Sequence, residues 1–295
     1  MVMETVDAHL ITQFSDRVHL AAQQIKSRLK PFVLLKAMIG DDFAYDGLGV
    51  VEDREATSRI TPTKFDDIDH NRRKIKRRRF VVTLPIDASD ARAQLLDPQS
   101  NYVTASVRAK ARRFDRIGVE AAFADILTGR NFDTTTTFAS DGGNTINATG
   151  GSTYETLLEM IKEWTNNEVG VDSDEKFIFL LTGTEEEAFM QEVELVSGDF
   201  SRQFAIDKGH IKMALGVQMI AYGADVPNPI LSVVSGTRDC VAMAGRGLCF
   251  GLSKELKIEI KDRPDFVETH QVQVISELGA VRTEGVLVQK FQTTA

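Results

Sequence analysis

The amino-acid sequence predicts an α+β fold, and three observations lead to this prediction. A stretch that starts at Asp97 and Pro98 carries apolar residues at every third or fourth position, which is the spacing of one helical face. Residues 41–96, just before it, contain few helix signals and have the pattern of long extended strands. After residue 152, a short helix–strand–helix region precedes a series of strands that continues to the C-terminus.

The composition is typical of a globular protein. The 295 residues include 42% hydrophobic and 26% charged side chains, and the formal net charge is −8. No apolar run approaches the roughly 20 residues that a membrane helix needs, and the N-terminus lacks a secretory signal pattern, which predicts synthesis in the cytosol. Cys240 and Cys249 do not have the spacing of a CxxC metal pair, so we interpret both as packing residues.

The first segment, from Glu4 to Leu29, has the apolar spacing of an amphipathic helix that Lys30 and Pro31 end. A helix at this position has no preceding chain to pack against. It is either an arm that lies on another subunit or a helix that folds back on its own domain, and the periodicity does not decide between the two.

Residues 41–96 are predicted to form a long two-stranded excursion. Its extended stretches are expected at Ala56–Lys64 and Lys74–Ile86, with Gly47, Gly49 and Pro62 as interruptions. An isolated hairpin is marginally stable in water, so neighbouring residues of the same chain or of another chain must pair with it or cover it.

The long helix should begin at Asp97, as the N-cap, with Pro98 in the first turn. Its apolar face continues to Leu127, and Gly129 is placed to end it, which gives about 29 residues and roughly 43 Å. The other faces carry arginines that are either solvated or in contact with a partner. These arginines are Arg108, Arg112, Arg113 and Arg116.

Residues 130–150 have the polar composition of a loop, and we place the main domain boundary there. Ser152 to Glu155 has capping-box spacing, Lys176–Thr182 is predicted as a buried strand, and Thr184 to Glu187 is expected to start another helix. The strands expected after this region are Val217–Tyr222, Asp239–Ala244, Leu248–Leu252, Leu256–Ile260, Val267–Ile275 and Val286–Phe291.

The common catalytic motifs are absent. The sequence contains no GxxxxGK[ST], HExxH or GxSxG pattern, and the segment from Gly245 to Gly251 is better explained as a hairpin turn than as a dinucleotide site. The five histidines are scattered, and the acidic segment with Asp66, Asp67 and Asp69 lacks the glycine and distal glutamate of a calcium loop. We therefore predict no catalytic, cofactor-binding or metal-binding residue, and no enzymatic activity.

One segment is strongly basic, although the chain as a whole is acidic. Strand alternation would place cations on both of its faces, and such a ribbon should not pack on its own core. We interpret it as a contact between subunits, in which these cations meet acidic residues such as Asp66, Asp67 and Asp69 on adjoining copies. The alternative is a nucleic-acid-binding protein that acts through the same run, residues 72–79. The seven cations are Arg72, Arg73, Lys74, Lys76, Arg77, Arg78 and Arg79.

The order of these parts resembles that of the major capsid proteins of tailed bacteriophages, which have the HK97-like fold. The segment from Arg79 to Asp87, followed by Asp97 to Tyr102 and Ala111 to Ile117, is similar to the junction between hairpin and spine helix in those proteins. The segment from Gly279 to Val286 is similar to their closing strands.

This resemblance implies a domain organisation. It makes residues 1–40 an N-arm, 41–96 an E-loop hairpin, 97–150 a P-domain with the spine helix, 151–265 an α/β A-domain and 266–295 the return strands of the P-domain.

The resemblance also implies a structural subunit of the virion, made in the bacterial host cytoplasm, that assembles through arm and hairpin contacts into an icosahedral head. The expected partners are other copies in hexamers and pentamers, a separate scaffolding protein, a portal protein and a decoration protein. Double-stranded DNA would be enclosed without sequence-specific binding, and no cofactor or membrane is expected.

Overall fold

A computed structural model describes residues 23–51, 53, 55, 68, 70–87, 98–171, 175–192, 206–207, 209–263 and 269–294. No helix in these ranges is both long and apolar enough to cross a membrane. The elements are η1 (Lys30–Phe32), β1 (Leu34–Ala37), β2 (Asp42–Leu48), β3 (His70–Lys76), β4 (Arg78–Asp87), α3 (Pro98–Phe123), β5 (Ile126–Thr128), β6 (Thr134–Thr136), β7 (Asn144–Ala148), α4 (Tyr154–Asn166), β8 (Phe177–Thr182), α5 (Gly183–Gln191), β9 (Ile206–Asp207), β10 (His210–Ile211), β11 (Met213–Ala214), β12 (Val217–Tyr222), β13 (Val233–Val234), β14 (Thr237–Ala244), β15 (Leu248–Arg263), β16 (Thr269–Arg282) and β17 (Val288–Thr294).

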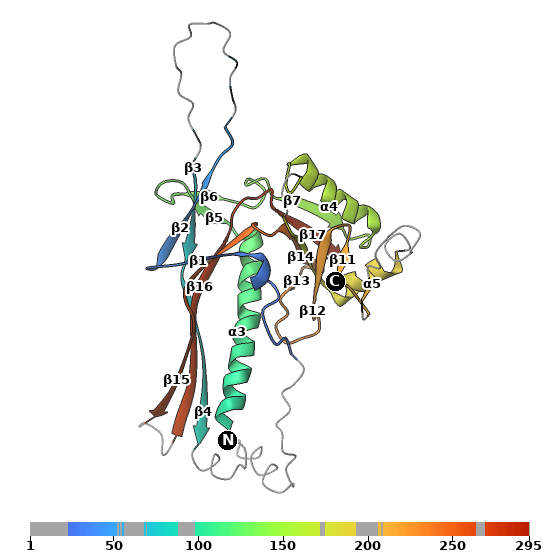
Figure 1. The fold of residues 1–295 in the computed structure, drawn as a ribbon. Helices are drawn as coiled ribbons and strands as arrows, with labels where there is room; N and C mark the ends of the chain where they lie inside the picture. The colour runs from blue at the N-terminus through green and yellow to red at the C-terminus, as the bar shows by residue number, and fades with distance from the viewer. Residues whose placement is uncertain are drawn as a thin grey trace.

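The long helix α3 stands between two sheets (Figure 1). On one side is a four-stranded sheet with the order β1-β15-β16-β4, whose long strands run beside the helix. Phe114 of α3 stacks on Phe250 of β15 with ring centroids 4.1 Å apart. Farther along the helix, Val103 packs against Val272 and Val274 of β16. These apolar contacts hold the helix and the long sheet together as one layered unit.

On the other side lies a seven-stranded sheet with the order β11-β12-β8-β14-β17-β7 and β13 paired to β14. Its central strands are apolar on both faces, as a sheet with covered faces requires. Phe179 of β8 makes edge contacts with Phe189 of α5 and Phe291 of β17. The helices α4 and α5 lie beside this sheet (Figure 1). The strands predicted at 176–182 and 217–222 are confirmed as β8 and β12.

The hairpin of β2 and β3 projects from the molecule at the end opposite to the free end of the long strands (Figure 1). Its register runs from Asp42 opposite Lys76 to Leu48 opposite His70. The expected stretch Ala56–Lys64 lies outside the described residues. The second expected strand is divided in two, because Arg77 separates β3 from β4 and β4 pairs with β16 along its whole length.

The grouping of strands therefore differs from the expected boundaries. The expected hairpin over 41–96 is wrong in its second half, because β4 belongs to the long sheet. The strand β15 also belongs to that sheet, although it lies within 151–265. Conversely, β7 and β17 join the seven-stranded sheet, although both lie outside the expected range 151–265. The turn from Gly245 to Gly247 is not a hairpin, because it links β14 to β15 in a different sheet.

The long helix is shorter than predicted. It ends at Phe123, and Ile126–Thr128 form β5 instead of a last helical turn. Ile126 is buried with Ile75 of the hairpin, which draws the chain out of the helix. Gly129 has a φ of +91° and serves the turn between β5 and β6.

The helices α4 and α5 begin close to the predicted positions, and their capping residues differ by one or two places. Thr153 forms the capping box of α4 with Thr156. Thr182 forms that of α5 with Glu185. Both cysteines are free and buried, which confirms their interpretation as packing residues.

The predicted N-terminal helix lies mostly outside the described residues, which begin at Gln23. Residues 23–29 are not helical, so the helix does not extend to Leu29 as predicted. This segment folds back on its own chain. Leu29 is buried in the main core, and Ser27 and Gln24 donate hydrogen bonds to Asp115 of α3.

Candidate interaction site at the base of the projecting hairpin

The cations of the hairpin itself pair with carboxylates of their own chain. Arg72 of β3 lies 2.7 Å from Asp46 of β2, and Lys74 lies 2.7 Å from Asp42. In the antiparallel register Asp46 lies directly opposite Arg72, whereas Asp42 lies opposite Lys76 and is the diagonal neighbour of Lys74. The Arg72 hydrogen bond lowers the pKa of Asp46.

Arg77, between β3 and β4, and the first two residues of β4, Arg78 and Arg79, are also paired within the subunit. Arg78 lies 2.8 Å from Glu120 of α3. Arg77 and Arg79 both reach Glu277 of β16, at 3.2 Å and 3.6 Å, and Arg77 also pairs with Asp41. The structure thus describes partners for these cations within the subunit, and their contact with adjoining copies stays a prediction. Reversing residues 77–79 to glutamate would also place carboxylates against this subunit's own acids.

Arg73 is the buried member of the run, with 2% of its surface exposed. Its two terminal nitrogens bind both oxygens of Asp141, at 2.7 Å and 2.8 Å. Arg282, at the end of β16, is fully buried and donates through Nε to the same carboxylate at 2.8 Å. We call Arg73, Asp141 and Arg282 the ionic node. Two guanidinium groups thus share one carboxylate in the interior, where breaking such a pair is costly.

The ionic node also closes the end of α3. Arg282 Nη1 donates to the carbonyl oxygens of Ala122 and Ala124 at 2.7 Å and 3.3 Å, so it satisfies carbonyls that the helix end leaves without a partner. Arg73 Nη1 donates to the carbonyl oxygen of Arg282 at 3.2 Å. The node therefore connects the hairpin, the long helix, the closing strand β16 and the loop before β7.

Beside the node, β3 crosses the long sheet in contact with two glycines. Gly251 of β15 and Gly279 of β16 lie opposite each other in register. Ile75 of β3 is fully buried above them. A Cβ on Gly279 would lie 2.3 Å from the carbonyl oxygen of Lys76, so only glycine permits this crossing. We call Gly251 and Gly279 the glycine slot.

The other predicted site residues are not gathered into one surface. Asp66, Asp67 and Asp69 lie outside the described residues. Among the arginines of the long helix, Arg112 donates to Gln23 and Arg116 donates to the carbonyl oxygen of Asn228. Arg113 lies 5.2 Å from the ring of Phe80, and Nε of Arg108 is buried without a hydrogen-bond partner. Arg112, Arg113 and Arg116 therefore attach α3 to three different neighbouring segments.

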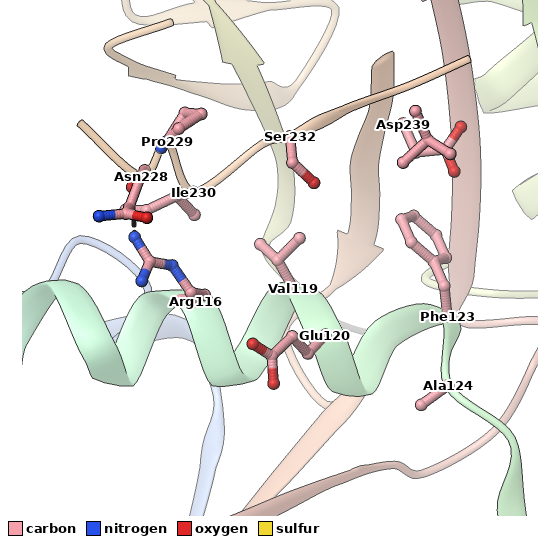
Figure 2. Close-up of a pocket in the computed structure, with 11 residues that line it drawn as sticks. Arg116, Val119, Glu120, Phe123, Ala124, Asn228, Pro229, Ile230, Ser232 and Asp239 are labelled. Carbon is pink, nitrogen blue, oxygen red and sulfur yellow. Dashed lines mark hydrogen bonds between the residues drawn. The ribbon is translucent and has the colours of Figure 1, made fainter. Parts of the chain in front are cut away.

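Two grooves flank the C-terminal half of α3. The first encloses 460 Å³ between the helix and the segment that carries Asn228 and Ser232, and Figure 2 shows Val119 pointing toward that segment and Phe123 pointing toward Asp239. The second encloses 660 Å³ next to the hairpin base, and Glu120 lines both. The second groove is bordered by the ion pairs of Lys74 with Asp42 and of Arg78 with Glu120.

The far part of the hairpin exposes apolar side chains that the sequence interpretation missed. Val50 is 96% exposed, and Leu48 and Val51 are more than half exposed. Ile68, on the returning side, is also partly exposed. Large apolar side chains that gather on a projecting element mark an interaction surface. The sequence carries this signal as the apolar run Leu48-Gly49-Val50-Val51, which lies among charged residues.

We predict a pH dependence from Lys110, which lies on α3 and donates to the carbonyl oxygen of Phe80 at 2.6 Å. Burial, with Arg113 nearby, lowers the pKa of Lys110 from 10.5 to about 8. Between these values the unfolded state binds the proton more strongly, so stability should rise with pH. Urea unfolding should show that this rise is absent in Lys110→Met. An equal rise in both proteins would contradict the assignment to Lys110.

Comparisons with known proteins were made for the sequence and for the fold. The family model described as "Phage capsid protein" matches residues 6–292. No curated protein sequence matches. Among solved structures, the fold is similar to the capsid of cyanophage P-SCSP1u, with a TM-score of 0.74, 14% identity, and coverage of 96% of this chain and 93% of that chain. It is also similar to the head structure of Helicobacter pylori bacteriophage KHP40, with a TM-score of 0.71, 12% identity, and coverage of 96% and 95%.

Proposed function

Because the chain belongs to the phage capsid protein family, and is a structural, non-enzymatic major capsid subunit of the virion, we propose that its projecting hairpin carries the contact between subunits. In this proposal the apolar far part of the hairpin, represented by Leu48, Val50 and Val51, lies on an adjoining copy. The observation that supports this proposal is that these side chains are exposed on an element that extends away from the body of the subunit.

The basic run has a different role in this proposal. Its cations pair with Asp42, Asp46, Glu120 and Glu277 of the same chain, so they keep the base of the hairpin folded. Ion pairs within the subunit reduce the charge that these side chains offer to phosphates, and nucleic-acid affinity depends on unneutralised cations. No described contact of this run favours the alternative of a nucleic-acid-binding protein.

The capsid subunit self-assembles into an icosahedral shell around the phage genome. We propose that the intermediate rings are hexamers and pentamers, and that a separate scaffolding protein, a portal protein and a decoration protein take part. Contacts that are individually weak add up in a closed shell, because each subunit is held at several places.

The observed sheets support a modified division into domains. We propose an N-arm before β1, an E-loop formed by β2 and β3, a P-domain formed by α3 with the long sheet, and an A-domain formed by the seven-stranded sheet with α4 and α5. The E-loop, the P-domain and the A-domain then follow the observed strand pairing, in place of the boundaries at residues 96, 150 and 265.

The test is a charged substitution in the hairpin. We expect Val50→Asp/Val51→Asp to abolish shells, because two carboxylates would be buried without partners at the contact. The unassembled subunit should unfold at an unchanged denaturant concentration, since both side chains are exposed. Val171→Asp, an exposed valine after α4, is the control and should still assemble. Normal shells from the double variant, seen by negative-stain microscopy, would refute the contact.

A further inference from the structure

We infer that the ionic node and the glycine slot form a rigid joint that sets the angle at which the hairpin leaves the subunit. Arg73, Asp141 and Arg282 are thus positioning residues for assembly. This inference rests on the proposed function only in its consequence for assembly, because the rigidity of the joint is a property of the single subunit. Three attachments of β3 to the body of the subunit form this joint.

The first attachment is the ionic node. Arg73 holds Asp141 with two parallel hydrogen bonds, a geometry that fixes the plane of both groups. Arg282 donates one hydrogen bond to Asp141 Oδ2 and another to a carbonyl oxygen at the end of α3, so it connects this ion pair to the helix. Because all three side chains are buried, solvent does not replace these bonds when the hairpin moves.

The second attachment is the glycine slot. The side chain of Ile75 seats over Gly251 and Gly279, two residues after Arg73 on the same face of β3. The strand β3 is therefore held at two alternate residues, by the ionic contact of Arg73 and by the apolar contact of Ile75. Rotation of the hairpin about either contact alone would break the other.

The third attachment is the short pairing between β3 and β5. Its register consists of Arg73 opposite Thr128. The outer strand β2 pairs with β3 alone, so the rest of the hairpin follows the direction that β3 takes. The small sheet is thus fixed at one residue of β3, and that residue is also the member of the ionic node. The described contacts of the hairpin with the body are concentrated at its base.

A fixed exit angle matters for a closed shell. Subunits that reach each other through projecting hairpins meet at an angle that the hairpin direction determines, and closed point-group symmetry tolerates only certain angles. A loose joint would leave the subunit folded and able to associate, but the products would vary in curvature. The expected defect is therefore in the shape of the assemblies and not in association itself.

The experiment compares Asp141→Asn with Leu157→Ala. The second variant removes a fully buried side chain of α4 and weakens the fold away from the hairpin. Amide hydrogen exchange of the unassembled subunit is the first measurement. In Asp141→Asn, exchange of β2 and β3 amides should increase at least about tenfold, with no matching increase in β8 and β14. In Leu157→Ala, β2 and β3 should be affected no more than β8 and β14.

Particle shape is the second measurement, made by electron microscopy at equal concentrations of folded subunit. Asp141→Asn should give open or irregular particles, whereas Leu157→Ala should give fewer but regular shells. If the β2 and β3 amides exchanged no faster in Asp141→Asn than in Leu157→Ala, the inference of a rigid joint would be refuted. Faster hairpin exchange together with regular shells would support the joint and refute the role of the hairpin in assembly. If Asp141→Asn does not fold, Arg73→Lys keeps the charge and loses the two-bond geometry, and the same outcomes apply.

Discussion

Asp115→Ala should lower the free energy of unfolding of the subunit by about 4 kcal/mol, because this change removes a fully buried carboxylate that several donors share. The carboxylate lies in the middle of α3 and accepts hydrogen bonds from the side chains of Gln24 and Ser27. It also accepts from the backbone nitrogens of Arg28 and Leu29, at 3.0 Å and 3.3 Å.

A donor from the seven-stranded sheet completes this arrangement. Tyr222 of β12 donates its hydroxyl to Asp115 at 3.0 Å. Burial and the neighbouring carboxylate raise the pKa of Tyr222, so the hydroxyl keeps its proton and remains a donor. Asp115 thus joins the first described residues, the long helix and the seven-stranded sheet. Its removal would leave buried N–H groups without acceptors, and that loss dominates the expected effect.

The measurement is guanidinium unfolding of the unassembled subunit, with Tyr222→Phe as the matched control. The control removes one of the shared hydrogen bonds and should cost about 1 kcal/mol. Hydrogen exchange of residues 24–29 should increase strongly in Asp115→Ala and slightly in the control. If the two variants lost the same stability, the carboxylate would not be the centre of this contact.

The elements that follow local rules were predictable from the sequence. The start of the long helix was recovered at Pro98, a residue that favours the first turn. The strands β8 and β12 were recovered because their apolar residues reflect the burial of each segment. The α+β class followed from the order of these segments. The burial of Cys240 and Cys249 followed from the habits of free cysteine.

The parts that depend on distant pairing were not predictable. Nothing near β4 in the sequence indicates that it pairs with β16, about 190 residues later in the chain, and not with the hairpin. The end of α3 was misjudged for the same reason, since Arg282 caps it from another element.

The basic run shows how a local rule can fail. Strand alternation places Arg73 and Ile75 on the same face of β3, and the inference that a ribbon with cations on both faces cannot pack on its own core was wrong. That face is buried because Asp141 neutralises Arg73 from a loop 68 residues away, and because two glycines make room for Ile75. Neither feature forms a periodic pattern in the sequence. The partner of Arg73 is one distant carboxylate, and the space for Ile75 comes from two glycines that are far apart in the chain.

Gly279→Ala should destabilise the subunit by about 3 kcal/mol, because the added Cβ would meet backbone atoms that cannot turn away. The new carbon would lie 2.3 Å from the carbonyl oxygen of Lys76 and 2.9 Å from Cγ2 of Ile75. Either β3 must lift from β16 or β16 must bend, and lifting β3 would separate Ile75 from its buried cluster.

The control for this prediction is Gly150→Ala, where the space around an added Cβ is open within 4 Å. That variant should differ from the unmodified subunit by less than about 1 kcal/mol. Thermal unfolding of both variants is the measurement. A further distinction comes from hydrogen exchange, because lifting of β3 should expose the β2 and β3 amides before the seven-stranded sheet opens. If Gly279→Ala unfolded like the control, β3 could cross the sheet without the slot, and the joint at the hairpin base would then depend on the ionic node alone.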